Sequence, residues 1–226
     1  MYHPSHAYFS TRYRLADVAR ALIHALGDEL KFSLKGEGQA STTGPHAKEA
    51  ALAALPTGDH DLAAFWVFKE PPLLEHQARF VLWRDGTVDM TFWDWDDEVY
   101  EGDREGPDEA QRAEKRLFFF KLHRALVKDA GAILSVLSNY TDKYGGAPHP
   151  EELAELVANA LKQEPSRGLN LVVKHEDFFW LLAIDKRVFA EPLRAYRKQL
   201  EKDFHAVEET PDYLILQRNT RGPIFF

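Results

Sequence analysis

The sequence predicts an α+β fold in which a largely antiparallel sheet of about five to seven strands packs against four or five helices, one of them long and central. The first observation is that the predicted strands follow one another in adjacent pairs, whereas a doubly wound parallel sheet alternates single strands with helices. The second is an Asp-Gly turn between two apolar runs, and the third is the helical spacing of apolar residues between the paired strands.

The length and composition indicate an ordinary folded protein. The chain has 226 residues, of which 45% are hydrophobic and 28% charged. We expect a single α+β domain over residues 1–226. A two-lobed organisation is the alternative, because residues 141–150 contain Gly145, Gly146 and two prolines and are typical of a linker.

The first third of the chain supplies helices, a loop and a strand. Apolar residues three and four apart predict a helix over residues 15–30. Residues 36–45 are rich in Gly, Ser and Thr and indicate a loop, and the Ala-rich residues 46–55 predict a short helix. Aromatic and β-branched residues predict a buried strand over 62–69, which Pro71 would terminate.

A β-hairpin is predicted for residues 79–84 and 87–92, joined by Asp85 and Gly86 in a two-residue turn. This turn would pair Arg84 with Thr87. That register would place one apolar set on the core face: Val81, Trp83, Val88, Met90 and Phe92. The opposite face would be only half polar, so we expect helices of the chain or a partner to cover its aromatic residues.

A long central helix is predicted to begin near Pro107 and to continue to about residue 140. Proline and acidic residues favour a helix start, and Gly131 would mark a bend or a close contact. The apolar residues that carry the helical spacing are Leu117, Phe119, Leu122, Leu126, Ala130, Ile133, Leu137 and Tyr140.

The last third predicts a helix, two strands, a helix and a second hairpin. The ranges are 150–161 for the first helix, 169–174 and 177–184 for the strands, 191–203 for the second helix, and 205–208 with 213–217 for the hairpin.

Net charge is concentrated in one segment. Nine of the sixteen residues 94–109 are acidic and only Arg104 is basic. This segment therefore carries the entire net charge of −8, and the rest of the chain has equal numbers of acidic and basic residues. Three large aromatic residues, Trp93, Trp95 and Tyr100, lie beside these acids. Acidic surfaces speed the encounter with basic partners, and aromatic anchors supply affinity. The predicted partner-binding residues are Trp93, Asp94, Trp95, Asp96, Asp97, Glu98, Tyr100 and Glu101.

The function that follows is a non-enzymatic, cytoplasmic binding protein that engages a cationic protein partner, with an inhibitor or immunity-type protein as one form. A well-solvated segment without a binding role is the simpler alternative, because charge runs usually face water. An accessory or scaffold module that dimerises through its aromatic surface is a further alternative. The C-terminal residues 221–226, which end in two phenylalanines, would either pack back on the domain or dock on a second subunit in a homodimer.

Clustered carboxylates also allow a metal site, which would support a metal-assisted hydrolase. Residues at positions 1, 3, 5 and 12 match a calcium-binding loop, namely Asp94, Asp96, Glu98 and Glu105. However, Val99 stands where such a loop needs glycine. A looser divalent-cation site formed by Asp94, Asp96 and Asp97 is the low-ranking alternative to no metal at all.

Histidines give no stronger site. His3 and His6 form a short HxxH pattern without carboxylate neighbours. Residues 175–177, a histidine followed by two acids, would lie at the opposite end of a strand from Asp185, which disfavours acid–base catalysis. We expect His24 and His123, within helices, to lie at or near the surface.

Several classes of function are excluded or disfavoured. The absence of cysteine removes disulfides and thiolate metal sites, and no phosphate loop, dinucleotide fingerprint, zinc-protease motif or serine elbow is present. We therefore expect no catalytic residues and no cofactor. The negative charge disfavours nucleic acid, and neither a signal peptide nor a membrane-spanning segment is indicated.

Overall fold

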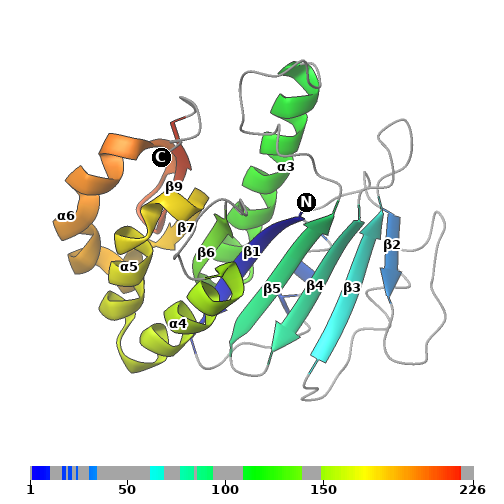
Figure 1. Ribbon diagram of the computed structural model, residues 1–226, viewed down its shortest axis with the longest axis horizontal. Helices are drawn as coiled ribbons and strands as arrows, with labels where there is room; N and C mark the ends of the chain where they lie inside the picture. Colours follow the sequence, from blue (N-terminus) through cyan, green and yellow to red (C-terminus); the bar gives the residue numbers. More distant parts are fainter. Residues whose placement is uncertain are drawn as a thin grey trace.

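The computed structural model describes residues 2–10, 17, 18, 20, 21, 24, 31–34, 62–68, 77–83, 86–93, 109–138 and 149–219. It consists of one antiparallel sheet with helices packed against it (Figure 1), which confirms the α+β class. The sheet has nine strands, more than the sequence predicted, in the order β2-β3-β4-β5-β1-β6-β7-β9-β8.

The nine strands of the sheet are four to eight residues long. They are β1 (Tyr2–Phe9), β2 (Lys31–Leu34), β3 (Leu62–Phe68), β4 (Gln77–Trp83), β5 (Thr87–Trp93), β6 (Ala132–Ser138), β7 (Phe179–Asp185), β8 (Phe204–Glu209) and β9 (Tyr213–Arg218). Strands on both sides of residues 141–148 therefore belong to one sheet.

The described helices lie on both faces of the sheet. They are α3 (Glu109–Lys128), α4 (Pro150–Gln163), α5 (Pro165–Lys174) and α6 (Lys186–Asp203). On α3, His123 bonds to Ser135 of β6. The next residue, Val136, points to the opposite face, where it packs in a core with side chains of α4, α5 and α6 (Figure 1). The part of the sheet formed by β6, β7 and β9 thus lies between α3 and the other three helices.

The central strand β1 was not predicted from the sequence. It pairs with β5 over residues 2–8 and with β6 from Ser5 to Phe9. Its sequence does not show the pattern of a strand, because Pro4, Ser5 and His6 are unusual residues in an inner strand. Pro4 lies beyond the part of β1 that pairs with β6, so its missing N–H is tolerated there.

The predicted long helix is wrong beyond Lys128. The chain turns at residues 129–131, where Gly131 has φ +81°, and β6 then runs through the core. All seven residues of β6 are buried. A strand buried on both faces is apolar at nearly every position, so Ile133 and Leu137 matched the helical spacing by coincidence.

The predicted strand over residues 169–174 is also wrong, because this segment is the second half of α5. Its buried residues Leu169, Val172 and Val173 lie three and four apart, which is the spacing of one helix face. Pro165 occupies the first turn of the helix, where its missing N–H costs nothing.

The first hairpin forms, but its register differs from the prediction by one residue. Leu82 pairs with Val88, and three residues join the strands. Gly86, at φ +92°, donates from its N–H to the Trp83 carbonyl at 3.2 Å, as in a three-residue hairpin loop. A one-residue shift moves the side chains of one strand to the opposite face relative to the other strand. Trp83 therefore does not share the core face with the buried Val88: it is 44% exposed and donates to Asp89.

The other predicted elements agree with the described structure where it covers them. The strand at 62–69, the strand at 177–184, and the second hairpin correspond to β3, β7, and β8 with β9. The helix predicted over 191–203 begins earlier, at Lys186, and is kinked at Phe189. The helix predicted over 46–55, residues 141–148 and the C-terminal residues 221–226 lie outside the described residues. Within the described part, no helix is long and apolar enough to cross a bilayer.

Candidate functional site

Trp93 is the residue at which the predicted partner-binding segment leaves the sheet. It ends β5, and its backbone lies opposite Tyr2 of β1 and Gln77 of β4. Figure 1 shows the N-terminus beside this end of β5. The remaining predicted partner-binding residues lie outside the described residues, as do the candidate metal ligands: Asp94, Trp95, Asp96, Asp97, Glu98, Tyr100 and Glu101. The segment therefore starts from the middle of a nine-stranded sheet.

A buried polar cluster crosses the sheet between α3, β6, β1 and β5. His123 Nδ1 lies 2.7 Å from Ser135 Oγ, and both residues are fully buried. Ser135 Oγ also donates to the backbone carbonyl of His6 at 3.4 Å. His6 Nε2 lies 3.6 Å from Asp89 Oδ1. The expectation that His123 lies near the surface is therefore wrong.

Burial keeps these histidines neutral. It lowers the pKa of His6 to about 4 and that of His123 to about 3. Burial, followed by the negative charge of Asp89, raises the pKa of Tyr8, whose hydroxyl donates to the Ala154 carbonyl at 3.3 Å. His123 and Tyr8 thus connect the sheet to α3 and α4, respectively, through hydrogen bonds between neutral groups.

The cluster contains a serine, a histidine and a carboxylate, but its geometry is not that of a catalytic triad. The histidine beside Ser135 is His123, whereas the histidine beside Asp89 is His6. Ser135 has no exposed surface on which a substrate carbonyl could approach. We assign the cluster a structural role. Its sequence signal was the position of His123 four residues after Phe119 and three before Leu126, on the buried face of α3.

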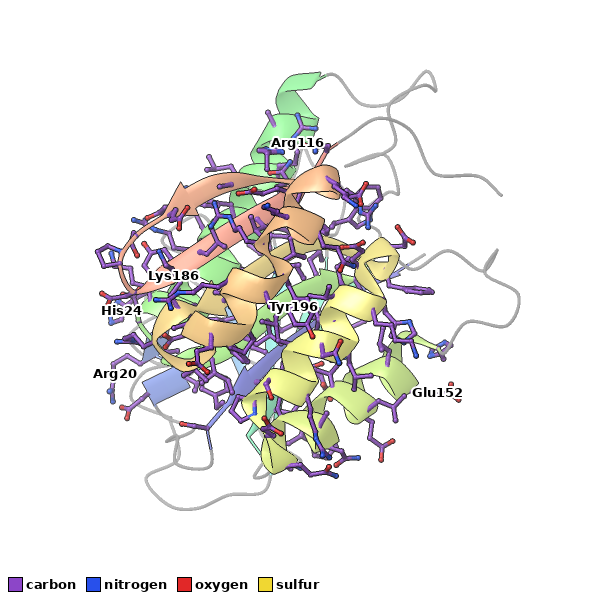
Figure 2. All side chains as sticks on the ribbon, turned by 90° about the vertical axis from the view of Figure 1, so that its left-hand side faces the viewer. Arg20, His24, Arg116, Glu152, Lys186 and Tyr196 are labelled. Atoms are coloured by element: carbon purple, nitrogen blue, oxygen red, sulfur yellow. The ribbon has the colours of Figure 1, made fainter. Side chains whose placement is uncertain are left out.

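Ion pairs connect α6 to β8. Glu209 accepts from Arg197 at 3.0 and 3.1 Å and from Lys186 at 2.9 Å. Hydrogen bonds from Arg197, and then from Lys186, lower the pKa of Glu209 to about 2. Arg124 of α3 pairs with Glu208 at 2.9 Å. Figure 2 shows this side of the molecule, with Lys186 and Tyr196 both projecting from α6. These carboxylates are matched by cations of the same chain.

Residues 175–177 form a polar turn before β7. Arg218 of β9 holds this turn: its Nε donates to the Phe179 carbonyl at 3.0 Å, and its Nη2 lies 3.4 Å from Asp177 Oδ1. Asp185 lies at the other end of β7, where it accepts the Arg187 N–H at 2.8 Å and caps α6. The two ends of β7 are thus separate, as predicted.

Metal ligation by histidine finds no support in the described residues. His6 is buried, and the side chain of His3 lies outside the described part of the structure. His24 is exposed, as expected. No three His, Asp or Glu side chains of the described part are grouped so that they could hold a metal ion.

No protein-family model, curated protein or solved structure matches this chain.

Proposed function

We propose that the chain is a binding protein, without catalytic activity of its own, that engages a cationic protein partner through residues 93–101. The observation that carries the proposal is the concentration of the whole net charge of −8 in residues 94–109 beside Trp93, Trp95 and Tyr100. A dense acidic strip raises the rate of encounter with a basic surface, and neighbouring aromatic rings provide the buried anchors of an interface.

The contrast with the second half of the chain supports this proposal. There Glu208 and Glu209 of β8 are each paired with arginine or lysine. Such pairs offer little attraction to a basic partner. In residues 94–109 the nine acids have only Arg104 among them, so the segment itself carries eight uncompensated negative charges along the sequence.

The origin of the segment at Trp93 adds a second argument. The Trp93 backbone is paired with two neighbouring strands, so the segment begins at a residue of the sheet. An interface that includes a residue whose backbone is already held in place loses less conformational entropy on binding. The serine and histidines that could otherwise suggest an enzyme are closed inside the core.

Charge reversal tests the proposal. A variant with Asp94→Lys, Asp96→Lys and Asp97→Lys should lose capture of its partner from cells of the source organism, because attraction becomes repulsion. We expect the captured protein to be basic, to bind again in purified form, and to bind more weakly as salt rises. The thermal stability of the variant should be unchanged.

A matched control changes net charge equally at other sites. Asp129 in the turn after α3, Glu155 on α4 and Glu191 on α6 are exposed acids. Their triple replacement by lysine should leave capture intact. If both triple variants lose the partner equally, net charge alone governs binding. If neither loses it, the segment is not the binding site. Both results would refute the assignment.

A further inference from the structure

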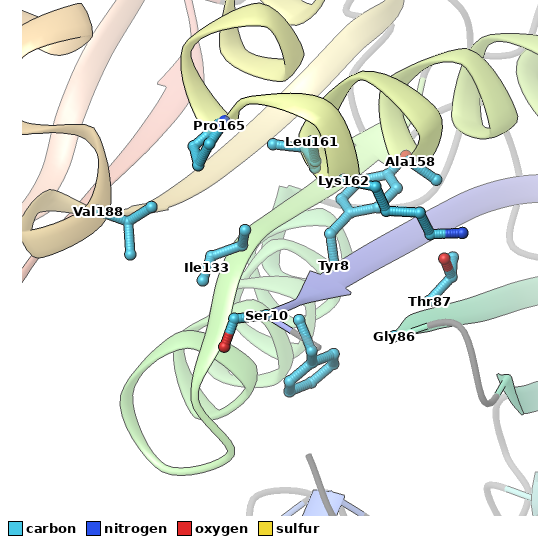
Figure 3. Close-up of a pocket in the computed structure, with 11 residues that line it drawn as sticks. Tyr8, Ser10, Gly86, Thr87, Ile133, Ala158, Leu161, Lys162, Pro165 and Val188 are labelled. Atoms are coloured by element: carbon cyan, nitrogen blue, oxygen red, sulfur yellow. The ribbon is translucent and has the colours of Figure 1, made fainter. Parts of the chain in front are cut away.

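The helices α4, α5 and α6 form one layer whose inner side packs on the sheet. On that side Leu161 of α4 and Pro165 of α5 line a cavity of about 220 Å³ together with Ile133 of β6 (Figure 3). Within the layer, α5 contacts both α4 and α6 and lies between them (Figure 2). The outer side of the layer therefore has two edges, one formed by α4 and the other by α6.

The edge formed by α6 is basic. Arg194, Lys198 and Lys202 are exposed and follow one another at intervals of four residues, which places them in a row along one face of the helix. None of the three has a hydrogen-bond or ion-pair partner among the described residues. Glu201, the acid next to Lys202, is paired with Arg197 instead. The basic row is therefore available to an acidic surface.

The edge formed by α4 is acidic. Glu151 and Glu155 are exposed, lie four residues apart, and have no hydrogen-bond or ion-pair partner in the part of the chain that the structure describes. Beside them, Leu156 is 51% exposed, the highest value among the large exposed hydrophobic side chains of that part. On the opposite edge, the exposed residue next to Arg194 is Ala195, whose side chain is small. The two edges thus match in charge and in the size of their apolar residues.

The middle of the layer carries little unpaired charge. α5 exposes Asn170 on its outer side, and its Arg167 is paired with Glu164 at 3.5 Å. Lys174 is exposed at the last residue of the helix, away from its middle. A twofold axis that runs along α5 would place α4 of one copy opposite α6 of the other, and α6 opposite α4.

We propose that this face binds a second copy of the chain and forms a symmetric dimer. Glu151 and Glu155 of one copy lie against Arg194 and Lys198 of the other. Leu156 packs on Ala195 of the other copy, between the alkyl parts of the basic side chains.

The distribution of charge favours a second copy over other partners. A partner whose surface has one sign of charge is repelled by one of the two edges, whereas a second copy is complementary to both. Because the axis repeats the contact, each dimer contains it twice.

This inference does not rest on the proposed function, because no residue of the range 93–101 takes part in the contact. Glu155 also belongs to the triple control at Asp129, Glu155 and Glu191. That variant should therefore capture the cationic partner while dimerising more weakly than the wild type. Retained capture with a weakened dimer distinguishes the two proposals.

Sedimentation equilibrium and NMR of the full wild-type chain give the first test. We expect a reversible dimer with a Kd below about 1 mM. The Kd should rise with salt, because the contacts join exposed charges. On dilution the amide signals of Leu156 and Ala195 should move together. The signal of Val207, which is 41% exposed on β8, should not move.

Charge reversal on each edge gives the second test. The variant Glu151→Lys, Glu155→Lys and the variant Arg194→Glu, Lys198→Glu should each be monomeric, because like charges then face each other in both contacts. An equimolar mixture of the two variants should form a heterodimer, since both of its contacts again join opposite charges. Circular dichroism checks that each variant is folded.

Four results would overturn the proposal. The first is a wild-type chain that stays monomeric at about 1 mM, and the second is a dimer that persists in either charge-reversal variant. The third is a mixture of the two folded variants that does not associate. The fourth is a lack of response of the Leu156 and Ala195 signals to dilution. This last readout uses the wild type alone, so it decides the matter even where a variant fails to fold.

Discussion

At the scale of single residues, buried polar groups connect the sheet to the helix α3. His123 and Ser135 satisfy each other across the interface of α3 and β6. Ser5 Oγ, His6 Nδ1 and His123 Nε2 are buried and have no hydrogen-bond partner among the described residues. A buried polar atom without a hydrogen bond lowers the free energy of unfolding, so this region contributes less to stability than its buried area alone would predict.

Removing one partner of the buried pair should cost more than removing both. Ser135→Ala leaves His123 Nδ1 without its partner and should lower the free energy of unfolding by about 1–3 kcal/mol. Adding His123→Leu removes the stranded group, so the double variant should be no less stable than Ser135→Ala. Urea denaturation measures both values. A double variant whose loss equals the sum of two large single losses would contradict this account.

The neutral histidines also predict a dependence of stability on pH. In the unfolded chain both histidines take up protons near pH 6.5, whereas the folded pKa is about 4 for His6 and about 3 for His123. The unfolded state therefore binds more protons, and the free energy of unfolding should fall as pH decreases from about 6.5 towards 3. The slope should approach about 1 kcal/mol per pH unit for each histidine.

Denaturant unfolding at several pH values tests this prediction, with the variant His123→Leu, Ser135→Ala as the control. The variant should lose stability less steeply than the wild type over the same range. Equal slopes, or a wild-type stability that does not change between pH 6.5 and 4.5, would show that the histidines are already solvated.

At the scale of elements, sequence patterns identified α4 well, because one of its faces meets water, whereas of the two fully buried strands β7 was predicted and β6 was not. The turn at Pro211 and Asp212 marked the second hairpin. β6 is buried on both faces and α5 is short, so neither pattern distinguishes helix from strand over so few residues. β1 was missed because Pro4, Ser5 and His6 resemble a terminal coil. Only its pairing with β5 and β6 makes it a strand.

The contact between α4 and α5 offers a test at this scale. A Cβ placed on Gly168 would lie 2.2 Å from Leu161 Cδ2, so α5 packs closely on α4 only because residue 168 is glycine. Gly168→Ala should lower the free energy of unfolding by about 1–3 kcal/mol through overpacking.

A double-mutant cycle separates this clash from a general helix effect. Leu161→Ala alone should destabilise by leaving a cavity, but together with Gly168→Ala the combined loss should be smaller than the sum. Additive losses would mean that the two residues do not contact each other in solution.

At the scale of the whole molecule, β1 connects the two parts of the sheet. It lies between β5 and β6, so the strands before and after residues 141–148 form one structure through the first strand of the chain. This arrangement could not be predicted from local patterns, because it depends on pairing between residues more than a hundred positions apart. For the candidate site, the sequence predicted only which residues belong to it, because its acidic and aromatic residues can be recognised from composition alone. Their arrangement in space could not be predicted.

Introducing a charge into β1 should therefore destabilise the entire molecule. Ala7 is fully buried between Val88 and Ser135. Ala7→Asp should lower the free energy of unfolding by more than about 3 kcal/mol, because an unpaired charge enters the core. Hydrogen exchange should show that β5 and β7 lose protection together. Loss of protection in β5 alone would instead indicate two independent lobes.

Recognition of a cationic partner also belongs to this scale, because it depends on where the charge of the molecule lies. The measurement that tests it most directly is the Kd of the purified partner for three proteins: the wild type, the triple variant at Asp94, Asp96 and Asp97, and the triple control at Asp129, Glu155 and Glu191. We predict that the first variant binds roughly a hundredfold more weakly and that the control stays within about threefold of the wild type. A segment variant that binds as tightly as the wild type would contradict the central claim.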